Sequence, residues 1–122
     1  MVLVDTSVWI AYFRFGNSRL KSLLADGKVA CHSFIVGELA CGRLQNREEI
    51  LSLLQTLPAA TQAEHEEVLQ FIERHRLMGL GLGYVDVHLL ASSLLSGIPL
   101  WTEDKQLRKA ALKLEICFKQ EG

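Results

Sequence analysis

Four acidic side chains stand in apolar stretches of this sequence, where an unpaired carboxylate is costly. They are Asp5 in "VLVDTSVWI", Glu38 in "FIVGELACG", Asp86 in "YVDVHLLAS" and Asp104 in "LWTEDKQL". Carboxylates that gather in one place repel one another, so a cluster of them persists only with protons or cations. Oxygen ligands without histidine or cysteine suit Mg²⁺ or Mn²⁺ rather than zinc. Such ions activate water and stabilise both the attacking and the leaving oxygen when a phosphodiester is cleaved, so the pattern predicts metal-dependent nuclease chemistry.

Helical spacing gives the strongest reason to place Asp86 inside the protein. Leu89 and Leu90 follow it at three and four positions and share its helix face. The polar residues of the same segment form a separate stripe: His88, Ser92 and Ser96. One such acid is equally well explained as a helix cap or a hydrogen-bonded buried group, but four favour a shared site. Acids on charged helical segments and on the tail are predicted to be solvated: Glu48, Glu49, Glu64, Glu66, Glu67, Glu73 and Glu121.

Length and composition set the limits for the fold. The 122 residues (13.7 kDa) fit one domain, 1–122, and 49% hydrophobic residues can supply its core. A formal net charge of −1 provides no general basic field, so nucleic-acid binding would need local basic patches. Three widely spaced cysteines without a CxxC motif indicate a reducing compartment. Without a signal peptide or a long apolar run, we expect a cytoplasmic protein with no membrane contact.

Apolar runs alternate with helical patterns along the chain and predict an α/β fold: a three-layer α/β/α domain with a mainly parallel central sheet of about five strands. The expected strands are 2–4, 28–33, a poor edge strand before Pro58, 98–102 and 114–118. Helices are expected over 6–13, 19–25, 34–42, 47–54, 63–79, 84–97 and 104–113. Ser18 and Ser33 are the predicted N-caps of the second and third helices, and Asp5 or Thr6 of the first. Sites in open α/β sheets lie beyond the carboxyl ends of the strands, where Asp5 and Asp104 stand.

Three stretches carry a resemblance to a known family: "VDTSVWI", "GELACG" and "GYVDVHLLASSLLSGIPLWTEDKQL". Together they span nearly the whole chain, and the last is the most specific, because it combines an Asp-bearing helix, a strand and a Thr-x-Asp motif. The sequence resembles PIN-domain ribonucleases, specifically VapC-type toxins of prokaryotic toxin–antitoxin pairs. The resemblance implies a PIN-like fold and an endoribonuclease that uses Mg²⁺ or Mn²⁺, with RNA as substrate, a cognate protein antitoxin and a homodimeric state.

The same resemblance implies roles for particular residues. By position, the metal site would consist of Asp5, Glu38, Asp86 and Asp104, and these acids would be catalytic. Thr102 of the Thr-x-Asp motif resembles a supporting hydroxyl, and Thr6 or Ser7 would assist. Many relatives carry a further acid two residues after the last Asp, where this chain has Gln106. One or two ions therefore remain possible.

Three other classes of protein compete with the nuclease interpretation. A catalytically silent PIN-type module that binds RNA or protein remains open, although the presence of all four acids argues against it. A phosphoacceptor receiver-like domain would need an acidic pair after the first strand, and a dehalogenase-like phosphatase would need Asp-x-Asp. Here the first strand is followed by Asp5-Thr6-Ser7.

Further motifs have weaker implications. The glycines of "GLGLG" have the wrong spacing for a dinucleotide loop, and the four histidines lack ligand spacing, so surface or helix-cap roles are expected for them. Arg14, Arg43 and Lys105 would hold RNA phosphates if the fold brings them to the acids. Tyr12 and Phe15 are candidates for a partner interface.

Overall fold

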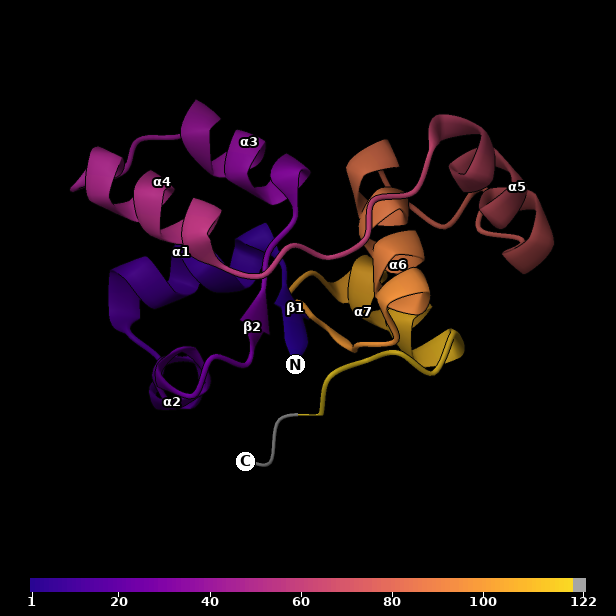
Figure 1. The fold of residues 1–122 in the computed structure, drawn as a ribbon. Helices are drawn as coiled ribbons and strands as arrows, with labels where there is room; N and C mark the ends of the chain where they lie inside the picture. Colours follow the sequence, from indigo (N-terminus) through magenta and orange to yellow (C-terminus); the bar gives the residue numbers. More distant parts are fainter. Residues whose placement is uncertain (120–122) are drawn as a thin grey trace.

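Three short parallel strands form the centre of the protein, seen in a computed structural model that describes residues 1–119 (Figure 1). Strand β1 (Val2–Val4) lies between β2 (Val29–Ala30) and β3 (Leu100–Trp101) and is parallel to both. All three β1 residues are buried, as expected for a central parallel strand covered on both faces. The sequence prediction of a mainly parallel α/β fold is therefore confirmed.

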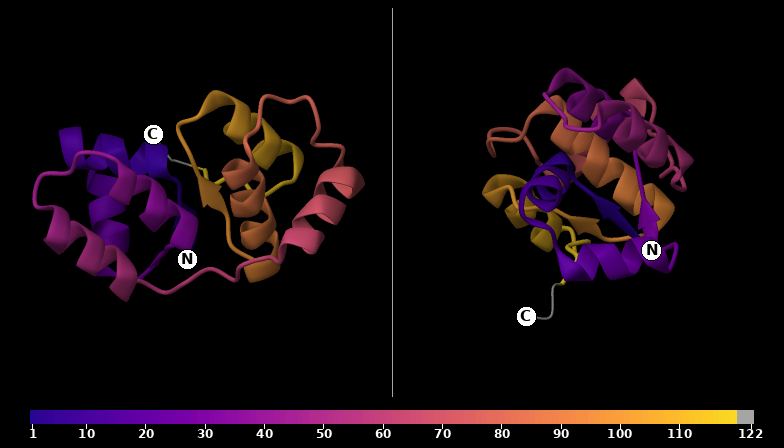
Figure 2. Two further views of the ribbon diagram at one scale, coloured as in Figure 1. Left: turned by 90° about the horizontal axis from the view of Figure 1, so that it is seen from above. Right: turned by 90° about the vertical axis from the view of Figure 1, so that its left-hand side faces the viewer.

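Seven helices surround the strands within residues 1–119, and the chain order divides them into two groups. Figures 1 and 2 show α1 to α4 on one side of the strands and α5 to α7 on the other. Their bounds are α1 Thr6–Phe15, α2 Ser18–Ala25, α3 Ser33–Cys41, α4 Arg47–Thr56, α5 His65–His75, α6 Tyr84–Ser96 and α7 Lys105–Lys113. Large apolar side chains between the helices and strands are fully buried, among them Trp9, Leu89 and Trp101. The helices thus cover both faces of the sheet.

The prediction of about five strands was wrong, because the described residues form a sheet of only three. Where two more strands were expected, single bridges join Cys31 to Ala59 and Leu100 to Cys117. Pro58 has no N–H to extend the first pairing. Glu115, with a φ of 60°, leaves the extended conformation just before the second. Both segments therefore contact the sheet at one residue each.

Two predicted helix caps were also wrong. The Asn17 side chain, rather than that of Ser18, accepts from the Leu20 N–H at 2.9 Å at the start of α2. At the start of α3, His32 Nδ1 takes the place of Ser33 and accepts from the Phe34 N–H at 3.0 Å. Both Asn17 and His32 have the extended backbone of an N-cap, whereas the two serines are already helical.

Burial on the helix surfaces agrees with most expectations for the acidic residues. Glu48, Glu49, Glu64, Glu66, Glu67 and Glu73 are exposed, and Glu121 lies outside the described residues. The three cysteines are free thiols. Among the described helices, none has both the length and the apolar character needed to span a membrane.

Candidate functional site

Asp5 lies where β1 passes into α1, and two hydroxyl groups hold its side chain. Its backbone occupies the N-cap position of α1, but the carboxylate makes no cap hydrogen bond. Instead, Asp5 Oδ2 accepts from Thr102 Oγ1 at 2.7 Å and from Ser7 Oγ at 2.8 Å. The residue is 6% exposed, so these hydrogen bonds replace much of the solvation that the carboxylate loses on burial. Asp5 is therefore fixed toward the end of β3.

The segment that follows β3 is tied to the same point. Thr102, which is 4% exposed, also accepts the Asp104 N–H at 3.0 Å through Oγ1. Ser7 Oγ accepts the Glu103 N–H at 3.0 Å. Asp104 is exposed and begins α7, where its Oδ1 accepts from the Leu107 N–H at 2.9 Å. Thr102 therefore links Asp5 to Asp104, which are 99 positions apart in the sequence.

Glu38 approaches this point from α3. Its Oε1 accepts from Thr6 Oγ1 at 2.7 Å, next to Asp5 in the chain. The side chain is exposed, so the expectation of an apolar environment does not hold for Glu38. Its link to the first residue of α1 nevertheless brings it to the carboxyl end of β1.

Asp86 reaches the site from the first turn of α6, where its Oδ2 accepts from the Gly83 N–H at 2.9 Å. Partial burial raises the pKa of Asp86 above its ordinary value of 3.8, and the Gly83 hydrogen bond opposes this shift. The neighbouring charges of Asp5, Asp104 and Glu38 raise the pKa further. The fold therefore brings Asp5, Glu38 and Asp104 within electrostatic reach of Asp86. We call these four residues the acidic rim.

The donor set of the acidic rim fits a hard cation. Within residues 1–119, each of the four carboxylates accepts hydrogen bonds through one oxygen, and its second oxygen accepts none. Four such oxygens suit Mg²⁺ or Mn²⁺. No three Asp, Glu, His or Cys side chains of the described residues are arranged as a preformed metal site, however. Repulsion between the like charges favours this separation of the carboxylates, and each acid accepts a hydrogen bond from its own donor instead of approaching another acid.

Of the three basic residues considered as phosphate ligands, two lie beside an acid of the rim in one groove. Arg14 and Arg43 line a groove of about 760 Å³ together with Glu38, between α1, α3 and the α3–α4 loop. Lys105, the third, follows Asp104 in the chain and is exposed. The groove therefore places two cationic side chains beside one acid of the rim.

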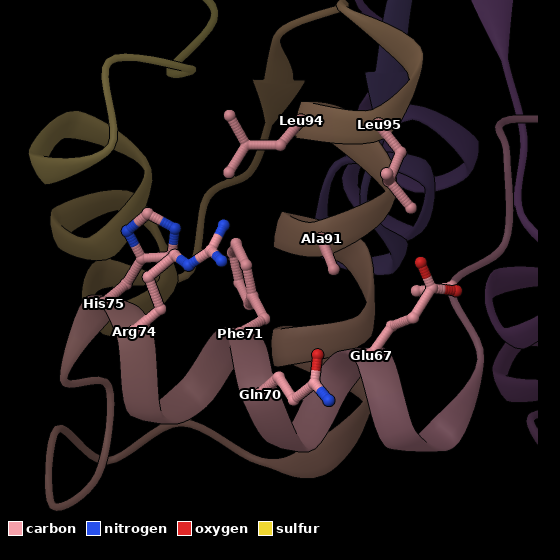
Figure 3. A pocket seen from close by; sticks show the side chains of 9 residues that line it. Glu67, Gln70, Phe71, Arg74, His75, Ala91, Leu94 and Leu95 are labelled. Carbon is pink, nitrogen blue, oxygen red and sulfur yellow. The ribbon is translucent and has the colours of Figure 1, made fainter.

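A second hollow, shown in Figure 3, lies between α5 and α6, at the end of α6 away from Asp86. Its volume is about 270 Å³, and Phe71, Arg74 and His75 of α5 face Leu94 and Leu95 of α6 across it. None of the four rim acids lines this hollow. The chemistry implied by the carboxylates is therefore at the other end of α6.

The polar stripe predicted for α6 was wrong. His88 and Ser92 are buried, as is Ser93, and Ser96 is half-buried with its Oγ accepting the Thr61 N–H at 2.8 Å. Every residue from Val87 to Ser93 is buried, so this part of α6 has no solvent face for a periodic pattern to mark. The sequence pattern therefore did not predict that His88 is buried.

The parallel sheet and the acidic rim at its carboxyl end define the class of protein. The family model described as PIN domain matches residues 2–113, and the chain belongs to the PIN domain family.

Comparison with curated proteins narrows the relationship to the VapC type. The chain is 43% identical to Ribonuclease VapC32 of Mycobacterium tuberculosis, in two strains, over 99% of this chain and 98% of the relative. Among solved structures, it is similar to PAE2754 from Pyrobaculum aerophilum, with a TM-score of 0.61 and 18% identity. That match covers 94% of this chain and 88% of the other. The structural likeness independently supports the fold.

Proposed function

We propose that this protein is a Mg²⁺- or Mn²⁺-dependent endoribonuclease and the toxin of a toxin–antitoxin pair, acting in the cytoplasm. The observation that carries the proposal is the acidic rim, formed by Asp5, Glu38, Asp86 and Asp104 in a chain similar over its full length to Ribonuclease VapC32. The relative's name supports RNA as the substrate class. The paired hydroxyls on Asp5 and the free second oxygen of each acid support a metal-binding role.

Each residue of the site has a proposed task. The four carboxylates would hold one or two ions through their free oxygens. Gln106, which lines a hollow with Gly81, adds no charge to the set. A bound ion supplies a polarised water and charge stabilisation for phosphodiester hydrolysis. Thr102 acts as a positioning residue, because its hydroxyl holds both the Asp5 carboxylate and the Asp104 backbone. Arg14 and Arg43 would bind RNA phosphates beside Glu38.

The proposal is tested by cleavage of labelled single-stranded RNA by the purified protein with Mg²⁺ or Mn²⁺. Asp5→Asn should lower the rate by orders of magnitude and leave the far-UV circular dichroism unchanged, because it removes a charged ligand but little volume. Asp26→Asn is the matched control, since Asp26 is an exposed acid that ends α2, and it should cleave at the wild-type rate. Full activity of Asp5→Asn, or undiminished wild-type cleavage in EDTA, would refute the metal-nuclease proposal.

We also propose two protein partners. A small cognate antitoxin would insert an Arg or Lys near the acidic rim, where no base of residues 1–119 is paired with the four acids. A second copy of the chain would bind through α1, where Phe15 is 81% exposed and Tyr12 is partly so. Large exposed apolar side chains of this kind are typical of interaction surfaces.

A PIN domain that binds RNA without cleaving it is the second candidate. The observation that favours it is the separation of the acids: within residues 1–119, no three of them are arranged as a preformed metal site. The cleavage assay separates the two candidates, because a silent module would bind the RNA but leave it intact at every concentration of Mg²⁺ and Mn²⁺.

A further inference from the structure

Five aromatic rings form a continuous cluster near the N-terminal ends of α3, α5 and α6. We call it the ring cluster; it consists of His32, Phe34, His65, Tyr84 and His88. Ring centroids are 5.0 Å apart for His32–Phe34, 4.7 Å for Phe34–His88 and 4.6 Å for Tyr84–His88. His65 completes the cluster through Nδ1, which forms a hydrogen bond with the Tyr84 hydroxyl. His88 thus lies between one ring of α3 and one ring of α6.

The ring cluster borders the acidic rim on the same two helices. Phe34 stands one turn before Glu38 on α3, a spacing that places both side chains on one face of the helix. Tyr84 and Asp86 both lie in the first turn of α6, but residues two apart leave a helix on different sides, so the cluster meets the rim through Phe34 and Glu38. Tyr84 is 44% exposed and Phe34 is half-buried, so both rings retain surface that a ligand can reach.

Contacts inside the cluster fix the position of Tyr84 without covering it. Its ring lies at 83° to the ring of His88 and at 56° to that of His65, and 44% of the residue remains exposed. Its hydroxyl is tied to α5 through His65. A ring that is exposed yet held at both ends is prepared to bind another ring at little cost in side-chain entropy.

Two imidazoles of the cluster are buried with one nitrogen unpaired. His32 Nε2 and His88 Nδ1 have no hydrogen-bond partner within residues 1–119, and the same is true of core atoms outside the cluster, such as Trp9 Nε1 and Trp101 Nε1. The two histidines therefore belong to the core of the fold, whereas Tyr84 and Phe34 reach its surface. Burial, aided by His88, also lowers the pKa of His32 to about 4, so this imidazole is neutral at pH 7 and does not attract phosphate by charge.

We propose that Tyr84, with Phe34 on the other side of His88, is the stacking platform for an unpaired base of the RNA substrate next to the phosphate that is cleaved. The inference rests on the proposed ribonuclease function and deepens it, because it names a residue that positions the substrate. Proteins that bind single-stranded RNA stack its bases on exposed aromatic rings, whichever base is present. Arg14 and Arg43 would hold phosphates in the groove beside Glu38, while the ring cluster holds a base.

The test is a binding titration of the full chain in EDTA, where metal-dependent cleavage is absent. The probe is a single-stranded RNA 12-mer with 2-aminopurine at one position, whose fluorescence falls when the base stacks. Wild type and Tyr84→Phe should quench the probe and bind with similar Kd. Tyr84→Leu and Tyr84→Ala should lose the quenching and bind about 5- to 150-fold more weakly, the usual range for one stacked base.

Two controls separate stacking from a structural effect. Phe71→Leu changes another ring that contacts a histidine, His75, at 4.7 Å, but in the second hollow, and it should leave RNA binding unchanged. An abasic nucleotide in place of 2-aminopurine should weaken wild-type binding as much as Tyr84→Ala does, and should not weaken that variant further.

The outcomes that overturn the inference are distinct from those that overturn the function. If Tyr84→Ala, or Tyr84→Leu where the alanine variant does not fold, binds and quenches like wild type, the platform is wrong although the nuclease stands. If Tyr84→Phe loses as much affinity as Tyr84→Leu, the hydroxyl bond to His65 matters and stacking does not. If wild type neither binds nor cleaves RNA, the proposed function fails and the platform fails with it.

Discussion

Replacing Thr102 with valine tests the link between the two strand ends. Valine keeps the shape of this buried side chain but removes the donor to Asp5 Oδ2 at 2.7 Å and the acceptor of the Asp104 N–H at 3.0 Å. A hydrogen bond to a charged group contributes about 1.5–3 kcal/mol to the free energy of unfolding. Unfolding entropy of about 2.1 cal/mol/K per residue gives about 0.26 kcal/mol/K for this chain of 122 residues. Dividing the lost free energy by this entropy predicts that Thr102→Val lowers the Tm by about 6–12 °C.

Thermal melting by circular dichroism in EDTA at pH 7, at one protein concentration, measures this effect. Thr102→Ser keeps the hydroxyl and should lose much less stability than Thr102→Val. Thr56→Val is the matched control, because Thr56 is exposed and its hydroxyl donates only to the Leu53 carbonyl of its own helix. That variant should stay within about 0.5 kcal/mol of wild type. A Thr102→Val protein that melts within about 2 °C of wild type would show that the hydroxyl does not hold Asp5 as the geometry indicates.

Further predictions concern metal, pH and assembly. Mn²⁺ at 100 times its Kd should stabilise the folded wild type by about 2.7 kcal/mol. Asp104→Asn keeps an acceptor for the Leu107 N–H, and Mn²⁺ should raise the Tm of this variant less than that of wild type. Equal rises in Tm would exclude Asp104 from the metal site. In EDTA, the pKa of Asp86 is higher in the folded state than in the unfolded state, so above about pH 4 the folded state holds a proton that the unfolded state has lost. The contribution of Asp86 to the free energy of unfolding therefore falls as pH rises from about 4 through the raised pKa. Asp86→Asn should therefore gain Tm relative to wild type between pH 4 and pH 7.5, and a constant difference would contradict that shift. Wild type should elute as a dimer from a sizing column and Phe15→Ser as a monomer; a monomeric wild type at high micromolar concentration would refute the α1 interface.

Local patterns in the sequence predicted the central strand and the position of two acids after strand ends. Val2–Val4 is short, apolar and mostly β-branched, which is typical of a strand covered on both faces, and the strand is found there. Asp5 and Asp104 follow strands β1 and β3, and parallel strands carry such residues to one edge of the sheet. These features depend on residue type and chain order, so no long-range contact was needed to predict them.

The backbone conformation of the folded chain decided two features that the sequence did not predict. The outer strands are reduced to the bridges Cys31–Ala59 and Leu100–Cys117, because Pro58 has no N–H to extend the first and Glu115, with a φ of 60°, leaves the extended conformation before the second. His32, not Ser33, caps α3 because the cap is chosen by where the backbone turns helical.

Burial and the detailed geometry of the site also depended on tertiary structure. His88 looks like part of a polar stripe in the sequence, but every residue of α6 from Val87 to Ser93 is buried, and the histidine lies between Phe34 and Tyr84. Glu38 stands among apolar neighbours in the chain and is nevertheless exposed, held by Thr6. A periodic pattern states which residues share a face of one helix, whereas only the packing of other elements determines whether that face meets solvent, a ring or another acid.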